Sequence, residues 1–147
     1  MNIKQILVPL DFSESGKITV EMAASLARDR GAVLEILHVE EPPLAYGGGE
    51  MYYGIPEPDH QAIRQMLNEV RPHDPGLEVV HRLAMGDPSE AIVRIAEEDE
   101  CDLIIISTHG RTGLTRMLLG SVAELVVRRA KCPVLTVKPR LEQDVPA

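Results

Sequence analysis

Four consecutive apolar residues, Leu103–Ile106, precede a glycine-bearing loop that leads into an amphipathic segment beginning near Ser121. A short, continuous apolar run of this kind is typical of a parallel strand that is buried on both faces. Neighbouring parallel strands need a long crossover connection, which is usually a helix. The run therefore predicts a strand–loop–helix junction inside an α/β fold.

The same alternation of apolar strands and amphipathic helices runs through the whole chain. It favours a parallel sheet with helices on both faces, joined by right-handed crossovers. Because 147 residues suit one core, we expect a single domain over residues 1–139 and a loose tail over 140–147. The five predicted strands are Lys4–Leu10, Val33–Val39, Leu77–Met85, Leu103–Ile106 and Pro133–Val137.

Capping residues mark the ends of the predicted helices. Ser13 or Ser15 can cap the first helix, and Gly31 ends it. Asp87 and Pro88 open a later helix as N-cap and first residue. The predicted apolar faces consist of Ile18, Met22 and Leu26 with Ala23 and Ala27 beside them in the first helix, Ile63, Met66, Leu67 and Val70 in the second, Ile92, Ile95 and Ala96 in the third, and Val122, Leu125 and Val126 in the last.

The charge and hydropathy patterns exclude several classes of protein. Acidic residues outnumber basic ones by 23 to 15, giving a formal net charge of −8, which argues against nonspecific binding to nucleic acid or to an anionic membrane. No apolar run approaches the roughly 18 residues of a membrane span, and the N-terminus has no signal-peptide pattern. We therefore expect a cytoplasmic protein in which Cys101 and Cys132 are free thiols.

The junction after the fourth predicted strand has the features of a phosphate site. Gly110 and Gly113 lack a Cβ atom, so their backbone amides can approach phosphate oxygens closely. Gly120, Ser121 and Val122 place further amides at the start of the last helix. The first amides of a helix have no partner within it and lie at the positive end of its dipole.

The commonest phosphate-binding motifs are absent. The chain has no GxxxxGK[ST], and its first strand is followed by Pro-Leu-Asp-Phe-Ser, which is neither GxGxxG nor SGGxDS. These absences exclude the commonest kinases, dehydrogenases and adenylating enzymes. What remains is Gly110, then nine residues, then Gly120-Ser121.

Four segments carry a resemblance to a known family: ILVPLDFSE, ILHVEEP, GDPSEAIVRIAEEDECDLIIISTHGRTGL and LLGSVAELVVRRAKCPVLTVK. They span nearly the whole chain and resemble the ATP-binding branch of the universal stress protein family. That branch has G-xx-G, nine residues and G-[ST] between the fourth strand and the last helix. Ser107 stands here in place of its first glycine, so we expect binding to be weakened or slightly displaced.

The resemblance implies an adenine nucleotide alpha hydrolase-like, Rossmann-like sheet with strand order 3-2-1-4-5. It also implies that the chain binds ATP, with Mg²⁺ or Mn²⁺ bridging the phosphates. Asp11 would recognise the adenine or ribose end, and Ile106 would pack on the nucleoside. The full candidate set is Pro9 and Val39 at the base, Asp11, Ile106, Ser107, and Gly110, Arg111, Gly113, Gly120, Ser121 and Val122 near the phosphates.

Several candidate residues also have a purely structural interpretation. Ser121–Glu124 matches the S-x-x-E capping box, and Asp11 can cap the first helix. His109 has no identifiable partner for catalysis, which favours a role in shaping the loop. The acidic run Glu97–Glu100 is most simply a solvated helix end, and Glu40–Pro58 is predicted to be a long loop.

Three classes of function are compatible with this pattern. The first is an ATP-binding regulatory module of the stress response, acting on a client such as a membrane transporter. The second is a slow ATPase or autophosphorylating enzyme, for which no convincing catalytic residue is visible. The third is a receiver-like phosphorylation switch, which is disfavoured because the third strand ends in Leu83–Gly86 without an acceptor aspartate.

The last predicted strand suggests how the chain assembles. In the order 3-2-1-4-5 this strand lies at an edge of the sheet, and Val134–Val137 lacks the charges that protect edge strands. Antiparallel pairing with a second copy across a two-fold axis would cover it. We therefore expect a homodimer.

Overall fold

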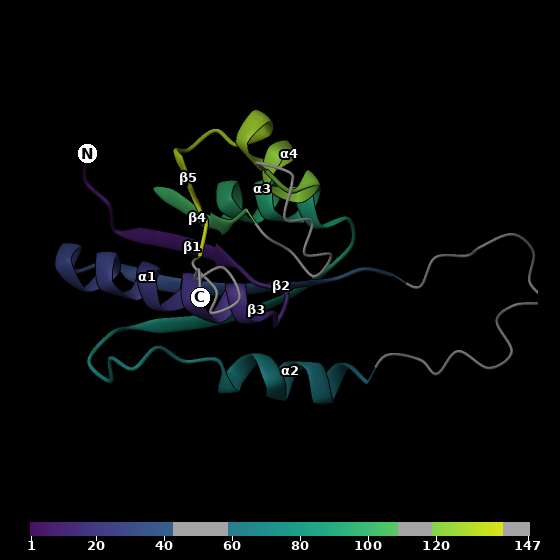
Figure 1. Cartoon of the computed structure of the whole chain (residues 1–147), viewed down its shortest axis with the longest axis horizontal. Coiled ribbons are helices and arrows are strands. Elements are labelled where there is room, and N and C mark those ends of the chain that lie inside the picture. The colour runs from purple at the N-terminus through teal and green to yellow at the C-terminus, as the bar shows by residue number, and fades with distance from the viewer. Residues whose placement is uncertain (43–58, 109–118, 140–147) are drawn as a thin grey trace, which may run out of the picture.

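The fold is a five-stranded parallel sheet with the order β3-β2-β1-β4-β5 (Figure 1), which confirms the predicted fold class and strand order. A computed structural model describes residues 1–42, 59–108 and 119–139. Most of the predicted loop 40–58 and the tail 140–147 lie outside that part of the chain. The elements are β1 (Gln5–Pro9), α1 (Glu14–Arg30), β2 (Val33–Glu40), α2 (His60–Glu69), β3 (Val79–Met85), α3 (Pro88–Glu98), β4 (Leu103–Ser107), α4 (Ser121–Arg129) and β5 (Val134–Val137).

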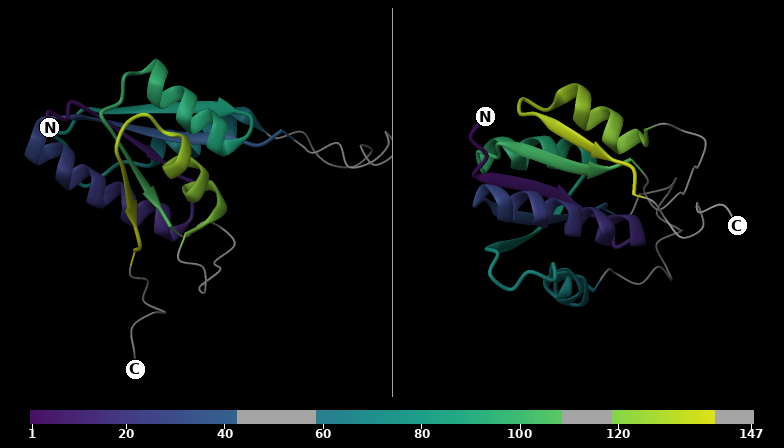
Figure 2. Two further views of the ribbon diagram at one scale, coloured as in Figure 1. Left: turned by 90° about the horizontal axis from the view of Figure 1, so that it is seen from above. Right: turned by 60° about the vertical axis from the view of Figure 1, so that its left-hand side comes forward.

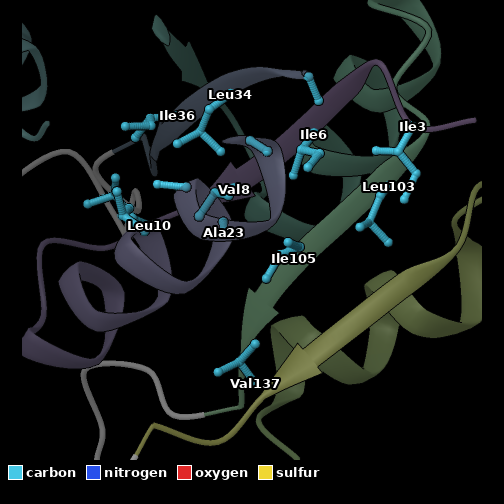
Figure 3. Packing of buried hydrophobic residues seen from close by; sticks show 14 of the residues in the cluster. Ile3, Ile6, Val8, Leu10, Ala23, Leu34, Ile36, Leu103, Ile105 and Val137 are labelled. Carbon is cyan, nitrogen blue, oxygen red and sulfur yellow. The ribbon is translucent and has the colours of Figure 1, made fainter. Parts of the chain in front are cut away.

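Helices cover both faces of the sheet (Figure 2), with α1 and α2 on one side and α3 and α4 on the other. Successive strand residues point to opposite faces, so Ile6 and Val8 pack under α1 while Leu7 packs under α3. Figure 3 shows the α1 side of this core. Burial on both faces explains why the central strands read as continuous apolar runs. Within the described residues no helix is long and apolar enough to cross a membrane.

The buried face of α1 matches the predicted one at Ala23 and Ala27 but not at the larger residues. Met22 is 51% exposed, and Ile18 and Leu26 are only partly buried. Small side chains let the helix lie close to the sheet, whereas the larger ones flank the contact. The prediction was also wrong for Met66 of α2, which is 48% exposed. The buried residues of α1 are Ser15, Gly16, Thr19, Val20, Ala23, Ala24 and Ala27.

The order of the strands reverses beside β1. The chain runs outward from β1 through β2 to β3, and then returns to place β4 on the other side of β1, with Leu7 opposite Ile104. The connection after β1 leads to α1 on one face, and the connection after β4 leads to α4 on the other. Diverging connections of this kind leave room for a ligand at the carboxyl ends of the strands.

A buried carboxyl group lies toward the opposite end of β2. Glu35 is 2% exposed and accepts a 2.9 Å hydrogen bond from Nε2 of Gln5. Burial, reinforced by a hydrogen bond with Asp99, raises the pKa of Glu35 to about 7. Burial opposes ionisation of Asp99, but hydrogen bonds from Glu35 and Arg82 hold its pKa below the usual range. The acidic end of α3 is therefore not wholly solvated, because Asp99 and Glu98 pair with Arg82.

Both cysteines are free thiols, as expected. Cys101 is buried, with its Sγ atom 3.8 Å from Oε2 of Glu35. Burial raises the pKa of this thiol to about 12, and burial also raises the pKa of Cys132. Because the thiolate is the reactive form, both groups are poor nucleophiles at neutral pH.

We predict that wild type loses stability as the pH rises from 5 to 8 and that Glu35→Gln does not show this loss. The folded-state pKa of about 7 exceeds the ordinary value of 4.5, so the folded chain binds more protons in this window and loses stability as the pH rises. The free energy of unfolding of the variant minus that of wild type should be larger at pH 8 than at pH 5, by on the order of 2 kcal/mol. Urea unfolding at both pH values measures this, with the exposed Glu78→Gln as control. A difference between wild type and Glu35→Gln that does not change with pH would contradict the prediction.

Candidate functional site

One cavity of about 610 Å³ lies at the carboxyl ends of β1, β2 and β4. It brings together eight of the candidate residues from connections far apart in the sequence. Gly110, Arg111 and Gly113 lie outside the described residues. The candidate residues that line the cavity are Pro9, Asp11, Val39, Ile106, Ser107, Gly120, Ser121 and Val122.

The turn after β1 places Asp11 in the cavity wall. Ser13 is the N-cap of α1, and its Oγ atom accepts a 3.2 Å hydrogen bond from the amide of Gly16. Oδ1 of Asp11 accepts a 3.0 Å hydrogen bond from the amide of Ser13. The interpretation of Asp11 as the helix cap is therefore wrong. Its carboxylate instead orders the turn while it lines the cavity.

The junction between β4 and α4 places backbone amides in the opposite wall. The N-cap of α4 is Gly120, without a side-chain cap bond, so the interpretation of Ser121 as the start of a capping box is wrong. The first backbone bond of the helix runs from the amide of Glu124 to the carbonyl of Gly120, at 2.9 Å. The amides of Ser121, Val122 and Ala123 therefore precede the helical ladder, and all three residues line the cavity.

Gly120 itself plays a different part from the one predicted. Its amide donates a 3.1 Å hydrogen bond to the carbonyl of Thr108, so this N–H group already has an acceptor. A Cβ atom at Gly120 would lie 3.0 Å from that carbonyl oxygen. The φ of −66° is open to any residue, so the close approach to Thr108 is what favours glycine here.

Two polar residues at the end of β2 were not predicted as part of the site. His38 and Glu40 lie in the cavity wall and are each 8% exposed. Nδ1 of His38 lies 2.9 Å from the carbonyl of Leu10, and its ring packs on Phe12 with centroids 4.4 Å apart. Polar residues at alternate positions of an otherwise apolar strand were the signal, but the predicted strand ended at Val39 and left Glu40 in the loop.

The two ends of the cavity have opposite polarity. The amides at the start of α4 lie at one end, while Glu40 ends β2 and Glu41 follows it at the other. Neither lysine nor arginine is found among the described residues that line it. The described residues also include no group of three or more His, Cys, Asp or Glu that could hold a metal ion. This arrangement suits an anion beside α4 and hydrogen-bond donors beside β2.

A model of the universal stress protein family matches residues 2–138. The chain belongs to this family. It is 30% identical to the universal stress protein MJ0577 of Methanocaldococcus jannaschii, over 92% of this chain and 94% of that protein. The resemblance stated from the sequence is therefore confirmed.

Solved structures of other universal stress proteins share this fold. One, from Archaeoglobus fulgidus in complex with dAMP, is 26% identical, with a TM-score of 0.67 over 94% of this chain and 100% of that one. Another, in complex with cAMP, is 25% identical, with a TM-score of 0.69 over 94% of this chain and 98% of that one. Members of the family with this architecture thus bind adenine nucleotides.

We predict that Gly120→Ala lowers the free energy of unfolding by about 1–2 kcal/mol, because the added Cβ presses on the Thr108 carbonyl. Gly16→Ala is the matched control. Its Cβ would meet Leu10 at 3.4 Å, an ordinary contact, and alanine favours a helix. We expect Gly16→Ala to be at least as stable as wild type in chemical denaturation. Equal stability of Gly120→Ala and wild type would show that the junction tolerates a side chain.

Proposed function

We propose that the cavity binds ATP, with the phosphates at the start of α4 and the nucleoside toward β1 and β2. The observation that carries this proposal is the set of three amides, Ser121 to Ala123, that precede the helical ladder and line the cavity. Such amides suit phosphate oxygens, and charge-assisted hydrogen bonds contribute roughly 1.5–3 kcal/mol each. The adenine nucleotides bound by the relatives support the choice of base.

The remaining candidates take roles consistent with their place in the wall. Asp11 would contact the ribose or adenine, with Pro9, Val39 and Ile106 against the nucleoside. Gly110, Gly113 and Arg111 would complete the phosphate end. Mg²⁺ or Mn²⁺ would be held by the phosphates, because the described residues form no cluster of metal ligands.

The biological role follows from holding the nucleotide rather than consuming it. The sequence offers no convincing general base or acceptor for a γ-phosphate. We propose a cytoplasmic regulatory module of the stress response, whose nucleotide occupancy changes its interaction with a client such as a membrane transporter.

The phosphate end can be tested separately from the nucleoside end with Ser121→Glu. A carboxylate at the first position of a helix favours folding but repels phosphate. We expect the variant to fold as wild type, to bind ATP with Mg²⁺ at least tenfold more weakly by calorimetry, and to bind adenosine unchanged. Ser25→Glu, on the exposed side of α1, adds the same charge away from the cavity and should leave both affinities unchanged.

The same proposal fails if wild-type protein binds no adenine nucleotide. Mass identification of small molecules released on denaturation, followed by titration with ATP and Mg²⁺, settles this point. An unchanged ATP affinity in Ser121→Glu would instead mean that the phosphates lie elsewhere.

We propose, too, that β5 joins two copies of the chain. It is an edge strand of the sheet, and Leu135 is 46% exposed beside an unprotected strand edge. Antiparallel pairing of two β5 strands would cover this side chain and extend the sheet across a two-fold axis.

We predict that Leu135→Lys shifts the protein toward the monomer. An added charge on an edge strand opposes pairing with a second copy. Val80→Lys is the matched control, because Val80 lies on β3, the other edge strand, and is 41% exposed. Light scattering at tens of micromolar should give a dimer for wild type and Val80→Lys and a smaller mass for Leu135→Lys. A monomeric wild type would contradict this assembly.

A further inference from the structure

Glu40 is a buried carboxyl group in the cavity wall whose hydrogen bonding is incomplete. It is the last residue of β2, and its side chain is 7% exposed. Oε2 lies 2.7 Å from Nδ1 of His60, the first residue of α2. Oε1 is excluded from water and has no hydrogen-bond partner among the described residues. A buried acceptor left in this state is costly, so a donor is expected to complete it.

The described residues around Glu40 do not supply that donor. His38, two residues earlier on the same face of β2, directs Nδ1 to the carbonyl of Leu10. Glu41 and Asp11 are acceptors when ionised, and the described lining has no lysine or arginine. The described wall thus leaves this acceptor to a molecule inside the cavity.

The position of Glu40 indicates which part of a nucleotide supplies the donor. Glu40 ends β2, whereas the amides of α4 follow β4, and β1 lies between these strands. Two strand spacings amount to roughly 10 Å. An acidic wall repels phosphate, so a nucleotide with its phosphates at α4 presents its nucleoside to Glu40. The donors of an adenine nucleoside are the exocyclic amine and the ribose hydroxyls.

We propose that Glu40 is a specificity-determining residue that accepts a hydrogen bond from a nucleoside donor, either the exocyclic amine or a ribose hydroxyl. This inference rests on the proposed nucleotide binding. His60 is a positioning residue, because its Nδ1 atom engages Oε2 and leaves Oε1 for the ligand. Bases with a carbonyl in place of the amine are disfavoured where the amine is the donor.

Glu40→Gln tests the contact, because it keeps the shape of the side chain and replaces one acceptor by a donor. Glu69→Gln is the matched control, since it removes the same charge from an exposed residue of α2 outside the cavity lining. Calorimetry on the full chain uses ATP, ITP, 2′-deoxy-ATP and 3′-deoxy-ATP, each with Mg²⁺. We expect Glu40→Gln to weaken ATP binding about tenfold or more, and Glu69→Gln less than twofold.

The analogues identify the donor. One analogue lacks the group that Glu40 contacts, and wild type should bind this analogue more weakly than ATP by a similar factor. For the same analogue, Glu40→Gln should cause little further loss of affinity, as in a double-mutant cycle. Glu40→Asp, which keeps the charge but retracts the carboxylate, should also lose affinity for ATP; unfolding midpoints establish that both variants are folded. Unchanged ATP binding in folded Glu40→Gln, or an equal loss of affinity for all four nucleotides, overturns the role of Glu40 but leaves the proposed nucleotide binding intact. Absence of binding by wild type overturns the proposed function with it.

Discussion

The parallel pairing of β1 with β4 is the contact on which the rest of the site depends. It sets Ile6 opposite Leu103 and Leu7 opposite Ile104, which brings the carboxyl ends of the two strands to one edge of the sheet. Because the connections after these strands leave for opposite faces, the space between them cannot be filled by either helix. Burial of the two apolar strands under helices on both sides therefore creates the cavity as a consequence of topology.

The opposite walls of that cavity differ in chemistry. After β4, the close approach of Gly120 to the carbonyl of Thr108 fixes where α4 begins, and so fixes the direction of its first amides. Around the carboxyl ends of β1 and β2, the wall carries carboxylates, among them Asp11 and Glu40. A ligand that is anionic at one end and rich in hydrogen-bond donors at the other matches this polarity, and a nucleotide has both features.

The sequence was most informative where one physical effect dominates. Continuous apolar runs predicted the strands. Glycines whose backbone amides can approach phosphate predicted the β4–α4 junction. The buried face of α1 was predicted only in part, because small residues, among them the expected Ala23 and Ala27, make the close contact while the larger Met22 is exposed. Ser121 was read as a cap because the motif does not reveal that the tight contact at Gly120 already starts the helix. Glu40 went unnoticed because its pairing with His60 joins elements that only the folded chain brings together.

In the proposed complex, the phosphates bind the first amides of α4 and the nucleoside lies across the tip of β1. Amide chemical shifts in ¹⁵N-labelled protein test this arrangement residue by residue, with ATP and adenosine titrated in parallel. We expect large shifts of Ser121, Val122 and Ala123 with ATP and small ones with adenosine, whereas Asp11 and Val39 shift with both ligands. Shifts of the three α4 amides that are equal for ATP and adenosine, or absent with both, would contradict it.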